Sequence, residues 1–156
     1  MRLTRDLREL LLPRQCPVCG KLLVESEDTM CALCAIGLPR HHITDTADNL
    51  LLRMVWGLAD VRRATTLLAY NHDSPYHSLI INIKFRGQGD LAVRLGQWAA
   101  TEAARQGFWE DADALVPVPL TWWRRWGRGY NQAEMLARGM SEATGLPVVN
   151  LLRRTE

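Results

Sequence analysis

Two pairs of cysteines constrain this chain more than any other feature of its sequence. The first pair is Cys16 and Cys19, the second is Cys31 and Cys34, and the 156-residue chain has no other cysteine. Two residues separate the thiols within each pair, and eleven residues separate the pairs. Each C-x-x-C turn brings two sulfurs together, and two such turns supply the four ligands of a tetrahedral zinc ion. The spacing therefore predicts a zinc ribbon, in which the closed four-thiolate site serves folding rather than catalysis.

Two other uses of the cysteines compete with zinc. A pair of disulfides is typical of exported proteins, but the first ten residues are charged throughout and lack the apolar core and cleavage site of a signal peptide. A redox-active pair needs a strand before its first cysteine and a long helix after its second, and Pro13 and Pro17 disfavour that context. Structural zinc in a cytoplasmic protein is therefore the expected interpretation.

Composition sets broad limits on the function. No apolar run approaches the roughly 18 residues of a membrane span, and a net charge of +2 does not by itself call for nucleic acid. The basic residues are 17 arginines and two lysines, Lys21 and Lys84. Arginine grips phosphate with a rigid fork of donors, although genome composition accounts for the same usage equally well.

Apolar spacing and turn signals divide the chain into alternating helices and strands. Helices are expected over residues 2–12, 48–58, 75–85, 90–106 and 131–144, and strands over 62–70, 114–120 and from 148. Pairing of the strand over 114–120 should fade at Pro117, which has no N–H to donate. The alternation after residue 62 predicts an α/β domain with a partly parallel sheet.

A basic, tryptophan-rich loop follows the expected strand over 114–120. No acidic residue lies between Ala114 and Ala133. This window holds three arginines and half of the six tryptophans, namely Arg124, Arg125, Arg128, Trp122, Trp123 and Trp126. In open α/β sheets, ligands bind at the carboxyl ends of the strands, where this loop is expected to lie. The glycines of the loop would let the backbone approach an anion closely, and the helix that follows would offer it free backbone N–H groups. Residues 128–132 (RGYNQ) therefore look like a phosphate or pyrophosphate cradle, and a solvated basic turn with tryptophans folded onto the sheet explains them equally well.

Four motifs in this order resemble the ComF family. They are the paired cysteines, residues 83–87 (IKFRG), residues 116–120 (VPVPL) and residues 128–134 (RGYNQAE). That family joins an N-terminal zinc ribbon to a type I phosphoribosyltransferase-like domain and is associated with competence for DNA uptake. The resemblance implies an N-terminal helix and zinc ribbon in residues 1–44. It implies the N-terminal part of a phosphoribosyltransferase-like sheet with flanking helices in residues 45–156.

The resemblance also implies a ligand, phosphoribosyl pyrophosphate, with Mg²⁺ bridging its pyrophosphate. By motif position, the phosphate-binding residues are Lys84, Arg124, Arg125, Arg128, Asn131 and Gln132. Among these, Asn131 and Gln132 would brace the loop. Arg153, Arg154 and Thr155 resemble the start of the family's flexible loop over the site.

One defining motif of the family has no counterpart in this sequence. The family has a strand that ends in two acidic residues and leads into a Thr-Thr-Gly loop, whereas the acidic residues 110–113 (EDAD) precede a strand here. We therefore expect a truncated chain that lacks the ribose 5-phosphate site and does not transfer a phosphoribosyl group alone. An incomplete sheet would also expose an edge and favour self-association.

Two functions follow as expectations. The first is a ComF-like protein of DNA uptake that binds phosphoribosyl pyrophosphate, with transferase-type chemistry, if any, resting on electrostatic stabilisation of the leaving pyrophosphate in a longer protein. The second is a zinc-ribbon module without enzymatic activity that binds single-stranded DNA or a DNA-processing protein. In that module Trp122, Trp123 and Trp126 would stack on bases while arginines neutralise phosphates.

Overall fold

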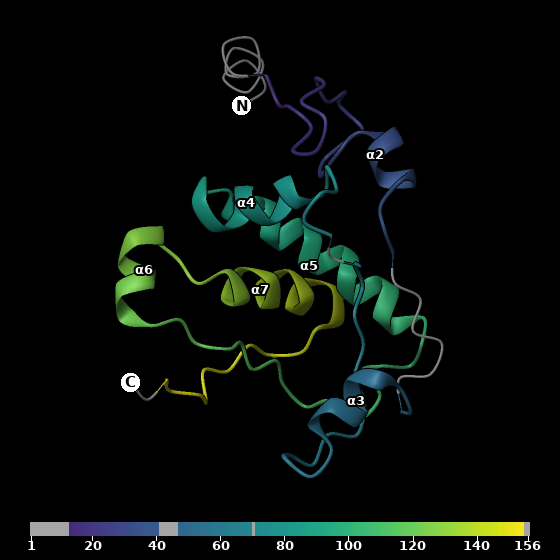
Figure 1. The fold of residues 1–156 in the computed structure, drawn as a ribbon, viewed down its shortest axis with the longest axis vertical. Coiled ribbons are helices and arrows are strands. Elements are labelled where there is room, and N and C mark those ends of the chain that lie inside the picture. The colour runs from purple at the N-terminus through teal and green to yellow at the C-terminus, as the bar shows by residue number, and fades with distance from the viewer. Residues whose placement is uncertain (1–12, 41–46, 70, 155–156) are drawn as a thin grey trace.

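A computed structural model describes residues 13–40, 47–69 and 71–154. The helices in this part of the chain are α2 (Ala32–Ile36), α3 (Leu50–Val55), α4 (His77–Phe85), α5 (Gly89–Ala104), α6 (Trp122–Arg128) and α7 (Gln132–Thr144). α5 and α7 cross at the centre of the molecule, α4 and the cysteine-bearing segment lie on one side of them, and α3 lies at the opposite end (Figure 1). The helix expected over residues 2–12 falls outside the described residues.

The helices expected over 48–58, 75–85, 90–106 and 131–144 are confirmed as α3, α4, α5 and α7. α5 begins one residue earlier than expected, and α3, α4 and α7 lie within the expected ranges. The ends of α7 show why the sequence signals worked. Asn131 caps its start by accepting a hydrogen bond from the backbone N–H of Ala133. Gly145 ends it at a φ of 78°, a left-handed conformation that favours glycine.

The contact between α5 and α7 depends on two glycines. A Cβ atom placed on Gly139 would lie 1.9 Å from the carbonyl oxygen of Val93, and one placed on Gly96 would lie 2.2 Å from the carbonyl oxygen of Leu136. Neither distance leaves room for a side chain, so the two backbones lie almost in contact. This close approach forms the centre of the fold.

The expected α/β sheet is wrong for the described residues. They contain isolated β-bridges in place of a sheet: Gln15 with Leu22, Arg40 with Leu68, and Leu115 with Val148. In the segment 114–120, Leu115 pairs with residues 147–149 through two backbone hydrogen bonds, and the prolines at 117 and 119 have no N–H with which to extend the ladder. The segment 62–69 has a bridging partner at a single position. The phosphoribosyltransferase-like sheet, and the exposed edge expected to drive self-association, are therefore absent from the described part of the chain.

The basic loop expected after residue 120 is instead a short helix, α6. It follows Thr121 and ends at Gly129, whose φ is 79°. α6 contains no buried residue. Its position therefore depends on the segments that precede and follow it and on exposed side-chain contacts, such as the ion pair of Arg125 with Glu134 at 3.3 Å, rather than on a buried face.

One hydrophobic cluster joins the cysteine segment to the helices. Its buried members are Cys16, Met30, Cys31 and Leu38 from the cysteine segment, Leu79 and Ile83 from α4, and Leu91, Ala92 and Leu95 from α5. Residues on both sides of the expected boundary at 44–45 thus share one core. Across the described ranges, no helix combines the length and apolar character that crossing a membrane requires.

Candidate metal centre and basic surface

The first cysteine pair lies in a tight turn. The backbone N–H of Cys16 donates to the carbonyl of Lys21 at 2.7 Å, and the N–H of Gly20 donates to the carbonyl of Cys16 at 2.9 Å. Gly20 has a φ of 73°, which an L-residue with a side chain rarely adopts. The glycine directly after Cys19 thus closes the turn that presents both thiols.

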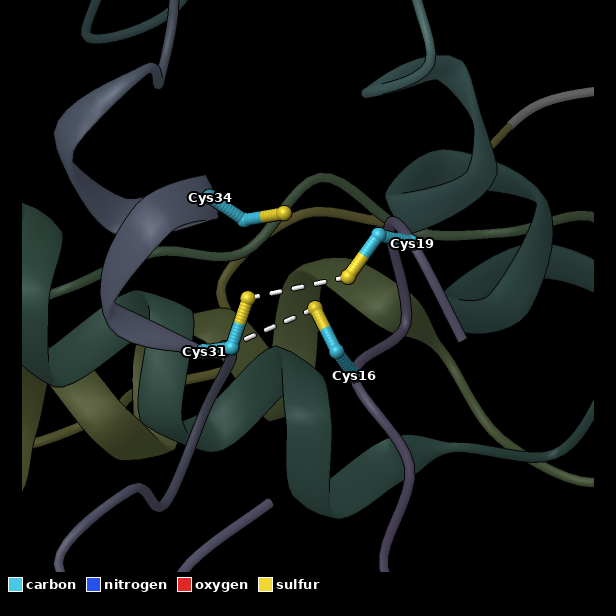
Figure 2. A group of neighbouring side chains, drawn as sticks. All are labelled: Cys16, Cys19, Cys31 and Cys34. Atoms are coloured by element: carbon cyan, nitrogen blue, oxygen red, sulfur yellow. Dashed lines mark hydrogen bonds between the residues drawn. The ribbon is translucent and has the colours of Figure 1, made fainter. Parts of the chain in front are cut away.

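The second pair lies at the start of α2. Cys31 precedes the helix and Cys34 lies within it, so one helical turn separates the thiols. The carbonyl of Cys34 accepts a hydrogen bond from the Tyr76 hydroxyl at 2.9 Å. Figure 2 shows the side chains of both pairs directed toward a common centre.

The four sulfurs have the spacing of a metal site. All four Sγ atoms lie within 4.8 Å of one another, and those of Cys19 and Cys31 are 3.6 Å apart. Four sulfurs around one zinc at about 2.3 Å would be separated by about 3.8 Å. The four cysteines are free thiols, and the backbone N–H of Cys31 points to Cys16 Sγ at 3.5 Å. The donor set and spacing therefore fit one zinc ion, and the disulfide alternative is not observed.

The electrostatics of the cluster are consistent with a cation site. Burial raises the pKa of Cys16, but hydrogen bonds from the backbone at Cys19, Cys31 and Val18 outweigh burial and bring that pKa to about 6. The pKa of Cys34 is raised, first by burial and then by its hydrogen bonds to the other three thiols. Because thiolates this close repel one another, a cation is needed to hold all four in the deprotonated form.

A pocket brings together two of the basic segments expected from the sequence. Arg125 of α6, Arg153 and Arg154 line it with Trp122 and Thr121, and its volume is about 770 Å³. Thr155, the third residue expected in the flexible loop, lies outside the described residues. Arg124 is exposed on α6. The pocket therefore gathers three arginines that the chain order alone does not place together.

Arg128 lies apart from this pocket, against the end of α4. Its guanidinium carbon is 5.1 Å from the centre of the Phe85 ring, and Lys84 is exposed in the same turn of α4. The Tyr130 hydroxyl donates to the carbonyl of Ile83. Burial raises the pKa of Tyr130, against the opposing charge of Arg128, so this hydroxyl remains a donor at neutral pH.

The residues that follow Tyr130 face inward. Asn131 is 2% exposed, and while its Oδ1 caps α7, its Nδ2 donates to the carbonyl of Val118 at 3.0 Å. Both polar atoms of this side chain are thus engaged within the protein. Gln132 Nε2 is buried and has no hydrogen-bond partner in the described structure.

The tryptophans of α6 face solvent. Trp122, Trp123 and Trp126 are 59%, 68% and 79% exposed, and the rings of Trp122 and Trp126 lie within 7° of parallel with centroids 6.0 Å apart. They do not pack on a sheet, which was one interpretation of this segment. The surface formed by residues 121–130 together with 153–154 is called the basic surface below.

The sequence did not indicate the contacts that Phe85, Tyr130 and Tyr76 make in the structure. The first two lie within the family-like motifs over 83–87 and 128–134, so motif membership was the available signal, but their contacts are long-range. The acidic residues before Leu115 serve another purpose, because Glu110 and Asp111 pair with Arg63 at 3.6 and 3.3 Å.

Comparison with known proteins supports the sequence resemblance. The chain is 35% identical over 79 residues to Competence protein F of Haemophilus influenzae, a match that covers 49% of this chain and 34% of that protein. It is 29% identical over 130 residues to DNA utilization protein YhgH of Escherichia coli strain K12, covering 81% of this chain and 53% of that protein. The YhgH protein of Shigella flexneri is 28% identical over the same length.

The chain spans about half the length of the YhgH proteins and about a third of Competence protein F. No family model matches the chain, and no solved structure does. The similarity to a competence protein and to DNA utilization proteins, together with the four-cysteine cluster, confirms the resemblance to the ComF family that the motifs predict.

Proposed function

We propose that this chain acts in DNA uptake or utilisation and that its basic surface binds phosphoribosyl pyrophosphate. The names of its relatives support the cellular role. The pocket that holds Arg125, Arg153 and Arg154 carries the ligand proposal. We also propose that residues 1–44 form a zinc ribbon and residues 45–156 the part that binds the ligand, the described residues of the two parts packing together in one hydrophobic cluster.

The chemistry of the pocket suits a pyrophosphate. Guanidinium groups offer paired donors that match phosphate oxygens, and the pocket has three of them, with Thr121 adding a hydroxyl at the rim. Arg125 also donates to Glu134 at 3.3 Å, so the ligand would compete with that carboxylate for this arginine. No acidic side chain lines the pocket among the described residues, so Mg²⁺ would enter with the ligand and bridge its pyrophosphate. A cavity of this size is within the usual range for small-molecule sites.

Replacing Arg125 or Arg153 with alanine should weaken binding of phosphoribosyl pyrophosphate in Mg²⁺ by about 10- to 100-fold, because each change removes charge-assisted hydrogen bonds. Isothermal titration calorimetry measures the affinity. Arg138→Ala is the matched control, since Arg138 is exposed on α7 and pairs with Glu142 rather than facing the pocket. Equal losses in all three variants, or no binding by the wild type, would contradict the proposed ligand.

A second function is favoured by the three exposed tryptophans of α6. Aromatic faces interspersed with arginines suit single-stranded DNA, because bases stack on the rings while the phosphates meet the guanidinium groups. This function and the first share the arginines and differ in their need for the tryptophans.

Titrating the intrinsic tryptophan fluorescence with an oligothymidylate separates the two functions. If single strands bind, Trp126→Ala should weaken binding about tenfold, and affinity should fall steeply as salt rises. The same substitution should change the affinity for phosphoribosyl pyrophosphate less than threefold, since Trp126 does not line the pocket. The absence of quenching at low salt would rule out this second function.

A further inference from the structure

α4 lies between the candidate metal centre and the basic surface. On the metal side, the Tyr76 hydroxyl, just before the helix, donates to the carbonyl of Cys34 at 2.9 Å. The side chain of Asn82 donates to the carbonyl of Pro17, inside the first cysteine turn, at 3.2 Å. Each cysteine pair is thus bonded to the α4 segment. Asn82 itself is 4% exposed, which protects this bond from water.

The last turn of α4 contacts the other side. The carbonyl of Ile83 accepts the hydrogen bond from the Tyr130 hydroxyl, and the ring of Phe85 lies under the guanidinium of Arg128. These two contacts attach the junction between α6 and α7 to α4. Ile83 also belongs to the core cluster that contains Cys16 and Cys31, so one helical turn contacts both regions.

These contacts matter because α6 contains no buried residue. Besides them, Arg125 donates to the carboxylate of Glu134 on α7 at 3.3 Å, so the orientation of α6 depends on this exposed ion pair and on the contacts at its ends. Its carboxyl end is held at Tyr130 and Arg128 by α4, and Asn131 then ties the start of α7 to the segment before α6. Removing one of these contacts should leave the fold intact and broaden the range of positions that the Arg125 side chain samples.

We propose that Tyr130 is a positioning residue that transmits metal occupancy to the basic surface. Zinc would bind both cysteine turns, and these turns are hydrogen-bonded to the α4 segment through Tyr76 and Asn82. The last turn of α4 in turn accepts the hydrogen bond from Tyr130. Occupancy of the metal centre therefore raises the affinity of the basic surface for a pyrophosphate-type anion. Coupling of this kind is reciprocal, so the anion also tightens zinc binding by the same factor. The expected change in anion affinity rests on the proposed function, whereas the role of Tyr130 in positioning α6 does not.

The first experiment uses the zinc-loaded chain and inorganic pyrophosphate with Mg²⁺. Tyr130→Phe removes one hydroxyl and keeps the ring, and it should weaken pyrophosphate binding about fivefold while zinc content stays at one per chain. Thr101→Ala is the matched control, because it removes a hydroxyl-to-carbonyl hydrogen bond within α5, away from α4. Loss of zinc in Tyr130→Phe would make Tyr130 a structural residue and overturn the proposal.

The second experiment measures amide hydrogen exchange over residues 128–134, which needs no anion. Asn82→Ala, with zinc still bound, cuts one bond between α4 and the first cysteine turn, and it should raise exchange there about fivefold. Tyr130→Phe should raise exchange over residues 128–134 by a similar factor. Exchange in the double variant should be little faster than in either single variant, because both substitutions interrupt the same series of contacts. Unchanged exchange in both single variants would refute the positioning role. Coupled exchange in a chain that does not bind pyrophosphate would preserve this role and instead reject the proposed function.

Discussion

Replacing Cys31 with serine is expected to abolish stoichiometric zinc binding and to lower the melting temperature of the whole described core. Zinc held by four thiolates contributes its binding free energy directly to folding, and loss of one thiolate should weaken zinc by about a hundredfold or more. The effect should spread because Cys31 belongs to the same buried cluster as Leu79 of α4 and Leu95 of α5. Elemental analysis gives the metal content, and calorimetry gives the transition.

The control for this substitution is Ala32→Ser, which places a serine one residue later on the exposed surface of α2. It should retain one zinc per chain and the wild-type transition. A wild-type chain that purifies without metal and still melts cooperatively at the temperature of the Cys31→Ser variant would show that the four sulfurs are not a folding site.

Substituting Gly139 with alanine is expected to cost about 3 kcal/mol of unfolding free energy, a large part of the margin that natural domains have. The new methyl would lie 1.9 Å from the carbonyl oxygen of Val93 and 3.0 Å from the backbone nitrogen of Gln97. These atoms are backbone, so α5 and α7 would have to separate to admit the methyl. Urea denaturation monitored by circular dichroism would measure the loss.

Gly127→Ala is the matched control, because a Cβ at Gly127 meets no atom within 4 Å. Gly127 lies inside α6, where alanine favours the helix by up to about 1 kcal/mol. The two changes should therefore have opposite signs. Equal stability of both variants would show that the close approach of α5 and α7 is absent in solution.

The candidate metal site was predictable because its information is local. A C-x-x-C turn with Gly20 behind it and a second cysteine pair at a helix start are each set by a few consecutive residues. The ends of α7 were predictable for the same reason, since Asn131 and Gly145 act on backbone groups within one turn. The basic surface was predictable only in part. Its arginines were recognised as a cluster in the sequence, but the gathering of Arg125 with Arg153 and Arg154 depends on how the chain returns after α7.

Local sequence was enough to predict the four-thiol cluster, four of the helices and the basic segment, because turns, caps and apolar spacing act between near neighbours. Features that need distant partners could be seen only in the folded chain. The strand-like segments over 62–69 and 114–120 each form one β-bridge in place of a sheet. The need for glycine at the contact between α5 and α7 is visible only in the structure, where the two backbones lie too close for a side chain. A strand needs hydrogen bonds from a neighbouring strand, and a close helix contact needs the backbone of the opposing helix. In both cases the partner lies far away in the sequence, so the residues nearby do not specify it.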